Sequence, residues 1–384
     1  MRLLEADEKN AGFIPAQLDR IRHQAEQWVA SESGTDSLVL LAARKGKIEF
    51  FEAFGRQDYA SDSPLSRDSI FYVASISKVI TATLAMQMVE RGELSLNRFL
   101  KEYVPEMSGK YADRILMHQL LTHTSGLAEV DDPPLWISPP ETDVPCPPGE
   151  TAHRHKYFQA LYKDDCYEKP GTQNMYANKN FNLLGEVIER ICGRSLEEVA
   201  QSQLFEPLGL SNTTFLSPHA LPAPVCQPDP SGLILESSLL DENVYGAATL
   251  KSNALELATF CQMFLNGGSY GGQQILHPWT VKEMTRNQIP GTGAFNFARQ
   301  WVNEGSWGLG WMVQGDARWP WSHGFLQPRG TYYHQGGTGT AMWVDPVHEV
   351  IGIYLSFSMV EMESGNPNWD LDRYQNMVTA AVQY

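Results

Sequence analysis

The chain has 384 residues, of which 42% are hydrophobic and 19% are charged, a composition typical of a globular protein with a large buried core. Its formal net charge of −16 argues against nucleic acid and anionic membrane surfaces as partners, because both require clustered basic residues. Every apolar run is far shorter than the roughly 18 residues of a membrane-spanning helix.

The cysteine pattern and the N-terminus bear on the cellular compartment. The five cysteines are widely spaced and odd in number, which favours reduced thiols over a disulfide scaffold or a zinc site. Residues 1–8 turn acidic at once and lack the apolar stretch of a secretory signal. Together these features predict a cytoplasmic protein, and nothing in the sequence indicates its oligomeric state.

Hairpin patterns lie near both ends of the chain. Apolar runs at residues 38–43 and 48–54 flank a turn that contains Gly46, and runs at 340–344 and 350–356 flank Asp345-Pro346. A helical pattern precedes the first hairpin at 15–31, and another follows the second at 369–382, with Asn368 as the expected N-cap. Between the hairpins the chain is mostly helical, with the clearest periodicity at residues 76–91, 181–191, 196–204 and 254–265.

These elements predict an α+β fold that forms one catalytic unit over residues 1–384. We expect an antiparallel sheet built from both chain ends, about residues 10–75 and 322–384, and flanked by helices. A mostly helical region, about residues 76–321, is inserted into it. Within that region, residues 133–148 contain seven prolines and should form an irregular loop. Residues 301–321 hold five tryptophans, which we expect to form a wall of the core.

The tetrapeptide Ser75-Ile76-Ser77-Lys78 places a nucleophile and a base one helical turn apart. Because residues three apart on a helix are neighbours, the Lys78 amine can reach the Ser75 hydroxyl. A Ser hydroxyl becomes a good nucleophile only when a neighbouring base takes its proton. The start of a helix also presents unpaired N–H groups and partial positive charge, where an acyl oxyanion would form.

Further short motifs follow Ser75 in order along the chain. They are Leu120-Leu121-Thr122-His123-Thr124-Ser125-Gly126-Leu127, Tyr176-Ala177-Asn178, Phe205-Glu206-Pro207-Leu208-Gly209-Leu210, Trp307-Gly308-Leu309-Gly310-Trp311 and His334-Gln335-Gly336-Gly337. With Ser75 and Lys78, these motifs resemble the serine β-lactamase and penicillin-binding-protein superfamily over about residues 38–360. The most similar branch is the class C-like one, which includes the family VIII carboxylesterases, D-aminopeptidases and related acyltransferases. The resemblance implies the β-lactamase-like fold.

The resemblance also implies a role for each matching residue. Ser75 would be the acylated nucleophile and Lys78 its amine partner. Tyr176 would shuttle protons, which requires the positive charge of Lys78 to lower the pKa of Tyr176 from about 10 by roughly three units. Asn178 would help to hold Lys78 and the substrate. The backbone N–H groups of Ser75 and Gly337 would form the oxyanion hole.

The last motif departs from the family pattern. Class C β-lactamases carry Lys-Thr-Gly where this chain has His334-Gln335-Gly336, and that Lys and Thr help to hold the substrate carboxylate. A His with an ordinary pKa is mostly neutral at pH 7, so a fixed hook for an anion is weakened. Related esterases and some D-alanyl-D-alanine peptidases carry His-x-Gly. Two interpretations stay open: His334 and Gln335 contact the substrate, or His334 is a strand residue with a structural hydrogen bond.

Other candidates are of lesser weight. Trp136 and Trp311 are the candidates for walls of an apolar substrate pocket. The segment Gly267–Gly271 matches the Gly-x-Ser-x-Gly nucleophile motif, but it follows a helix where that motif requires a strand, which indicates a surface turn. His123 should organise its turn. His153-Arg154-His155 lacks the Asp-His pair of a metallohydrolase, so we expect neither a metal nor a cofactor.

The sequence therefore predicts a serine hydrolase of the carboxylesterase type, which cleaves small-molecule esters, lactones included, through an acyl-enzyme on Ser75. The alternatives within catalysis are a β-lactamase, a D-amino-acid peptidase or an acyltransferase. The absence of a signal region counts against the first two, since their substrates are met mostly outside the cytoplasm. A non-catalytic binding pseudoenzyme with the same fold is the remaining alternative, and the intact Ser75, Lys78 and Tyr176 argue against it.

Overall fold

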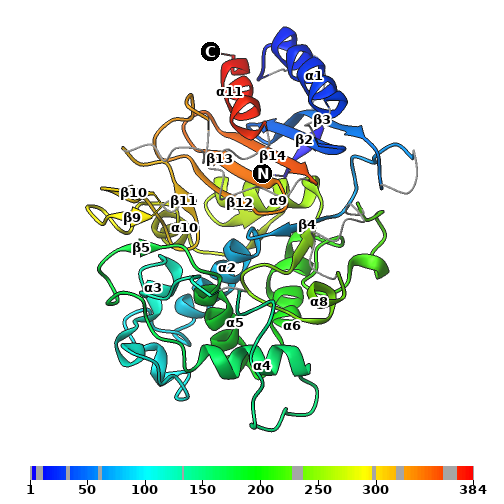
Figure 1. Cartoon of the computed structure of the whole chain (residues 1–384). Coiled ribbons are helices and arrows are strands. Elements are labelled where there is room, and N and C mark those ends of the chain that lie inside the picture. Colours follow the sequence, from blue (N-terminus) through cyan, green and yellow to red (C-terminus); the bar gives the residue numbers. More distant parts are fainter. Residues whose placement is uncertain are drawn as a thin grey trace.

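The computed structural model of the chain is shown in Figure 1. It describes residues 2–5, 12–31, 35–58, 63–131, 134–226, 237–295, 300–316, 324–357 and 370–383. The expected N-cap Asn368 and two of the five clustered tryptophans, Trp319 and Trp321, lie outside these ranges. Among the described helices, none has both the length and the apolar composition that crossing a bilayer requires.

The main sheet joins the two ends of the chain. Over the described residues its strand order is β1-β3-β2-β14-β13-β12-β11, and all neighbours pair antiparallel except β1, which is parallel to β3. The expected hairpins are confirmed as β2–β3 and β13–β14, and β14 pairs with β2. The strands are β1 (Leu4–Glu5), β2 (Ser37–Arg44), β3 (Lys47–Gly55), β11 (Met312–Val313), β12 (Tyr332–Gly336), β13 (Thr340–Asp345) and β14 (Val350–Ser356).

Helices cover both faces of this sheet (Figure 1). Every residue of β2 is buried, and its side chains alternate between the faces. Leu38 and Leu40 pack with helices α1 (Pro15–Ala30) and α11 (Leu371–Ala381), whereas Val39 and Leu41 pack toward α2 (Ser77–Glu90) and α9 (Ala254–Leu265). The α11 helix begins after Asp370, which holds the N-cap position that the sequence had suggested for Asn368.

The remaining elements lie mainly between the two hairpins. Strand β4 pairs antiparallel with β6 and leads directly into α2. The helices are α3 (Met117–Leu121), α4 (Ala152–Leu161), α5 (Asn178–Cys192), α6 (Leu196–Ala200), α7 (Glu206–Leu208), α8 (Ser237–Glu242) and α10 (Pro278–Met284), with short turns η1 (Leu100–Glu102), η2 (Ala112–Arg114), η3 (Gln201–Phe205) and η4 (Pro218–Ala220). The short strands are β4 (Phe71–Ala74), β5 (Asn174–Met175), β6 (Leu250–Ser252), β7 (Ser269–Tyr270), β8 (Gln273–Gln274), β9 (Ala294–Phe295) and β10 (Trp301–Val302).

The α2 helix runs through the core between the sheet and α5 (Figure 1). The helix predicted at residues 76–91 is confirmed, and all of its residues from Ser77 to Met88 are buried. A helix buried on all sides is held by packing from every direction, so its start is a rigid support for Ser75. The β7–β8 hairpin turns at Gly271, which confirms that the Gly-x-Ser-x-Gly match is a turn and no nucleophile elbow.

Candidate active site

Ser75 lies in the two-residue turn between β4 and α2. The preceding residue, Ala74, has a φ of 45°, in the left-handed region that residues other than glycine rarely adopt. The Ala74 carbonyl accepts a hydrogen bond from Ser77 Oγ at 2.5 Å, and Ser77 Oγ accepts one from the Leu250 N–H of β6 at 2.9 Å. These contacts hold the strained backbone at Ala74 in place and thereby fix the direction of Ser75.

Lys78 makes the contacts that the sequence predicted. Its Nζ lies 2.9 Å from Ser75 Oγ and 2.7 Å from Asn178 Oδ1, and Asn178 is the first residue of α5. A third contact was not expected: the Ala247 carbonyl oxygen lies 2.9 Å from Nζ. The side chain of Lys78 is fully buried. Elements far apart in the sequence therefore converge on one amine.

The surroundings of Lys78 favour its neutral form. Burial holds the pKa of Lys78 well below its usual value, while the charge of Glu129 opposes that shift. A neutral amine carries two N–H donors and one lone pair. Because Asn178 Oδ1 and the Ala247 carbonyl can only accept, they take the two donors, and the lone pair faces the Ser75 hydroxyl. This arrangement is the one that a general base for Ser75 requires.

Tyr176 shares the site, but its protonation differs from the sequence prediction. Lys78 Nζ lies 4.7 Å from the centroid of the Tyr176 ring, and the Tyr176 hydroxyl is hydrogen-bonded to Ser75. Burial raises the pKa of Tyr176, and the bond to Ser75 offsets this only in part. The expected lowering of the Tyr176 pKa is therefore wrong, because burial penalises the charged form of the phenol. Tyr176 stays protonated and serves as a hydrogen-bond donor.

Three rings surround Tyr176. The ring centroids of His123, Trp307 and His334 lie 4.6, 5.9 and 6.4 Å from that of Tyr176. His123 Nδ1 accepts a hydrogen bond from the Ala177 N–H at 3.1 Å, so it holds the chain beside Tyr176 as well as lying in the turn that the sequence assigned to it. The sequence placed Trp307 in a tryptophan-rich wall and in a family motif, but assigned it no part in the site. Its contact with Tyr176 could not be predicted, because residue 307 reaches the site only through the tertiary fold.

His334 is an uncharged member of the site. Its side chain is fully buried, and its Nδ1–H donates to the Gln335 carbonyl at 2.8 Å. Burial, with the nearby Lys78, lowers the pKa of His334 to about 3, so the imidazole is neutral at pH 7. Its Nε2 is then an acceptor, and no described residue bonds to it. The last motif thus offers a hydrogen-bond acceptor where class C β-lactamases have a cation.

The chain after His334 is fastened to the strand that carries Ser75. Thr340 Oγ1 donates to the Val73 carbonyl at 3.2 Å, and Thr338 Oγ1 donates to the Tyr72 carbonyl at 2.6 Å. A side chain at Gly336 would place its Cβ 2.3 Å from the Val73 carbonyl oxygen, so only glycine allows this approach. The turn at Gly337 is therefore held beside β4, as a second N–H donor for an oxyanion would require.

The family follows from comparison with known proteins. A family model described as Beta-lactamase matches residues 19–377. The chain belongs to this family. EstCE1, a hydrolase with promiscuous acyltransferase activity, has the same fold, with a TM-score of 0.74, 23% identity and coverage of 96% of this chain and 98% of EstCE1. A family VIII carboxylesterase has a TM-score of 0.73 at 18% identity, with coverage of 97% and 98%.

A relative detected by sequence carries a different name. A protein of Escherichia coli K12, provisionally named a D-alanyl-D-alanine carboxypeptidase, is 24% identical over 410 residues, which cover 95% of this chain and 88% of that protein. The chain is thus a serine hydrolase of the β-lactamase and penicillin-binding-protein family with the β-lactamase-like fold. Because the relatives are named for different reactions, the substrate class has to be inferred from the site of this family member.

Glu129 is a further charged group of this β-lactamase-family site that the sequence did not reveal. It follows the His123 motif closely and accepts the Lys179 N–H at 3.1 Å, at the start of α5 beside Asn178. Burial raises the pKa of Glu129, whereas Lys179 and Lys78 lower it. The Glu129 carboxylate comes near Lys78 only because the fold brings residue 129 to the start of α5, where Asn178 contacts Lys78. No sequence pattern therefore identifies Glu129.

The two tryptophans proposed as pocket walls occupy different environments. Trp136 is half-buried and packs against a small cluster formed by Leu240 and Tyr72, the latter three residues before Ser75. Trp311 is fully buried, and its ring centroid lies 5.0 Å from those of Phe264 and Tyr332. The placement of Trp311 in a pocket wall is therefore corrected, because a ring enclosed by the core has no face for a substrate. Trp136 keeps its proposed role.

Proposed function

We propose that this chain cleaves small, uncharged carboxylic esters, lactones included, through an acyl-enzyme on Ser75. The observation that carries the proposal is the setting of Lys78: its amine is buried, its two donors are taken by Asn178 and Ala247, and its lone pair faces the Ser75 hydroxyl. A base in that position performs the one step that an unactivated Ser cannot perform.

The proposed mechanism begins with acylation. Lys78 takes the Ser75 proton as Oγ attacks the ester carbonyl, and the N–H groups of Ser75 and Gly337 stabilise the resulting oxyanion. When the intermediate collapses, the Tyr176 hydroxyl donates its proton to the leaving alkoxide, and the Lys78 ammonium returns a proton to Tyr176. Because the pKa of Lys78 is lowered and that of Tyr176 is raised, this return is favourable. Water then hydrolyses the acyl-enzyme by the same steps in reverse order.

The charge of the site supports an ester over a β-lactam or a peptide with a free carboxylate. The latter substrates present an anion near the reacting carbonyl, and the family counterpart of His334 is a Lys that holds it. Here His334 is buried and neutral, and its free acceptor nitrogen suits an uncharged substrate or a hydrogen-bond donor. Trp136, beside Tyr72, supplies apolar surface for the acyl or alcohol group.

The test compares two chromogenic substrates under the same conditions. We expect hydrolysis of p-nitrophenyl butyrate by the wild-type protein, its loss in Ser75→Ala, and little turnover of nitrocefin. Dominant nitrocefin turnover would assign a β-lactamase instead. Ester cleavage that survives in Ser75→Ala would mean that another residue is the nucleophile. Butyryl transfer to an added alcohol, faster than hydrolysis, would assign an acyltransferase.

A further inference from the structure

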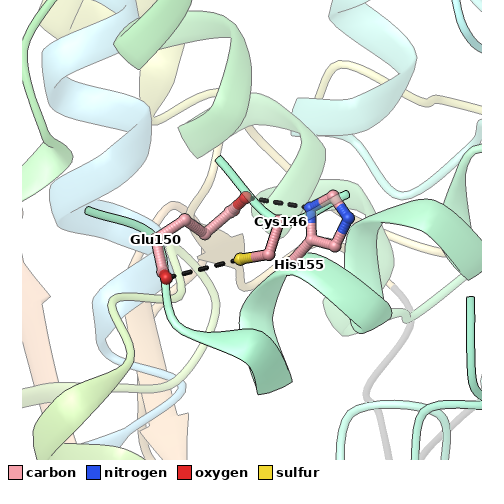
Figure 2. A group of neighbouring side chains, drawn as sticks. All are labelled: Cys146, Glu150 and His155. Carbon is pink, nitrogen blue, oxygen red and sulfur yellow. Dashed lines mark hydrogen bonds and ion pairs between the residues drawn. The ribbon is translucent and has the colours of Figure 1, made fainter. Parts of the chain in front are cut away.

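A mixed group of donor side chains lies away from Ser75, where the proline-rich segment enters α4. Cys146 Sγ, a carboxylate oxygen of Glu150 and a ring nitrogen of His155 all lie within 4.8 Å of one another. Figure 2 shows the Glu150 carboxylate against the His155 ring and Cys146 Sγ close by, directed at the backbone carbonyl of Glu150. The sequence motif His153-Arg154-His155 contains only one of these donors, and the other two come from the preceding loop.

The hydrogen bonds of His155 point to a cation in this group. Its Nε2 lies 2.9 Å from the Val144 carbonyl oxygen, and its Nδ1 lies 3.1 Å from Glu150 Oε2. Both partners can only accept, so a neutral His155 donates through Nε2 and turns the Nδ1 lone pair toward the carboxylate. The contact between Nδ1 and Oε2 is therefore satisfied either by a proton on Nδ1 or by a metal ion bound to both atoms. His155 is 5% exposed, and donation of the second ring N–H to a carbonyl is the usual arrangement of a metal-binding His.

A hydrogen bond to the second carboxylate oxygen of Glu150 fixes the side chain as a metal ligand would need. Oε1 accepts a hydrogen bond from Arg154 Nη1 at 2.7 Å, which leaves Oε2 beside His155 Nδ1. Ligating carboxylates are generally fixed by such outer contacts. Arg154 also forms ion pairs with Glu186 and Glu189, so three carboxylates surround one guanidinium. The net charge of this surrounding group is negative, which favours a divalent cation.

We propose that Cys146, Glu150 and His155 bind a divalent transition-metal ion, Zn²⁺ in preference to Mg²⁺ or Ca²⁺, with water as the fourth ligand. Thiolate, imidazole and carboxylate together are a typical donor set for zinc, whereas Mg²⁺ and Ca²⁺ take oxygen ligands. Cys146 is exposed, so the ion and its water have access from solvent. Binding releases the Cys146 thiol proton to solvent, and the ion takes the position between Nδ1 and Oε2.

The ion would tie the proline-rich loop to the start of α4. The loop that carries Cys146 also carries Trp136, which packs against the cluster of Leu240 and Tyr72, a residue of β4. Occupancy therefore stabilises the segment that borders the proposed substrate pocket, without contributing a group to the reaction. This binding does not depend on the Ser75 chemistry, so Ser75→Ala should bind the ion as the wild-type protein does.

The test is a Co²⁺ titration of the full-length protein after treatment with a chelator. We expect one equivalent to bind and to produce a near-ultraviolet thiolate-to-cobalt band together with the visible bands of tetrahedral cobalt, and Zn²⁺ to displace them. Cys146→Ser should abolish the thiolate band, and His155→Gln should weaken binding by about tenfold or more. Matched controls are Cys192→Ser and His153→Gln, which change the same residue types outside the group.

Two results would overturn the proposal. One is the absence of stoichiometric Co²⁺ or Zn²⁺ binding by the wild-type protein, which would leave a proton between His155 and Glu150 and make the group an ion pair. The other is a thiolate band that persists in Cys146→Ser. If either variant unfolds, judged by circular dichroism, Glu150→Gln provides the third test, because it keeps the size of the side chain and should still lower the affinity.

Discussion

Replacement of Asn178 by Asp tests the assignment of Lys78 as the base. The change keeps the size of the side chain and its oxygen but places a negative charge 2.7 Å from Lys78 Nζ. At an effective dielectric constant of about 20, two unit charges at that distance attract by roughly 6 kcal/mol. Burial of the new carboxylate opposes part of this, so a net effect of about 4 kcal/mol should raise the pKa of Lys78 by roughly three units.

The assay is the pH dependence of kcat/KM for p-nitrophenyl butyrate. This quantity reports the groups of the free enzyme, and here it should rise with pH as Lys78 loses its proton. A higher Lys78 pKa leaves more ammonium at a given pH, so Asn178→Asp should shift the acid limb to higher pH by roughly two to three units. At pH values below the acid limbs of both proteins, the activity of Asn178→Asp should be about 10²–10³-fold lower than that of wild type, and it should recover in alkaline buffer.

The control is Asn178→Ala, which removes the same oxygen without adding charge. It should lower kcat/KM, but its acid limb should not move to higher pH, because burial of Lys78 is unchanged. An acid limb at the wild-type position in Asn178→Asp would refute the reasoning, since the proton on Lys78 would then not control the reaction. Circular dichroism of both variants checks that the fold is intact.

Three further predictions concern packing and protonation. Gly336→Ala should destabilise the protein by about 1–3 kcal/mol and abolish esterase activity, since its Cβ would displace β12 from β4; a thermal melt within error of wild type would contradict this. Trp311→Ala should lower the unfolding free energy in a urea titration by about 3–5 kcal/mol and leave the preference for substrate chain length unchanged. Trp136→Ala should instead alter that preference across a series of p-nitrophenyl esters, with little effect on stability. The pKa of His334 is about 3 in the folded state and about 6.5 when unfolded, so its contribution to stability is complete above pH 6.5 and declines as pH falls toward 3. When the pH is lowered from 6 to 4, the unfolding free energy of His334→Gln, measured by urea titration, should therefore fall by about 2–3 kcal/mol less than that of wild type. Equal losses in the two proteins would argue against a neutral buried His334.

The parts of the site that sequence could predict are those set by local spacing. Ser75 and Lys78 meet because one helical turn separates them, and the hairpins at both ends follow from alternation around short turns. A single sheet built from both ends was expected, but the pairing of β14 with β2 that joins them was not predicted. Asn178 beside Lys78 came from the resemblance to a family and not from spacing, because residues 78 and 178 meet only through the fold.

What sequence could not predict depends on burial and on contacts between distant residues. The Ala247 carbonyl and the Glu129 carboxylate carry no motif, yet they help to set the proton on Lys78. The expected direction of the Tyr176 pKa shift was wrong because it considered only the charge of Lys78, whereas the burial of Tyr176, which no sequence pattern reveals, raises the pKa. Trp311 was misplaced for the same reason: composition does not distinguish a ring in the core from a ring at its edge.

The most direct test of the central claim is mass spectrometry of the protein during turnover of p-nitrophenyl butyrate. Rapid acid quenching should trap a butyryl adduct, and peptide mapping should place it on Ser75. The adduct should be absent from Ser75→Ala and should form much more slowly in Lys78→Ala, where the base is missing. A butyryl group on another residue, or full-rate acylation in Lys78→Ala, would contradict the account.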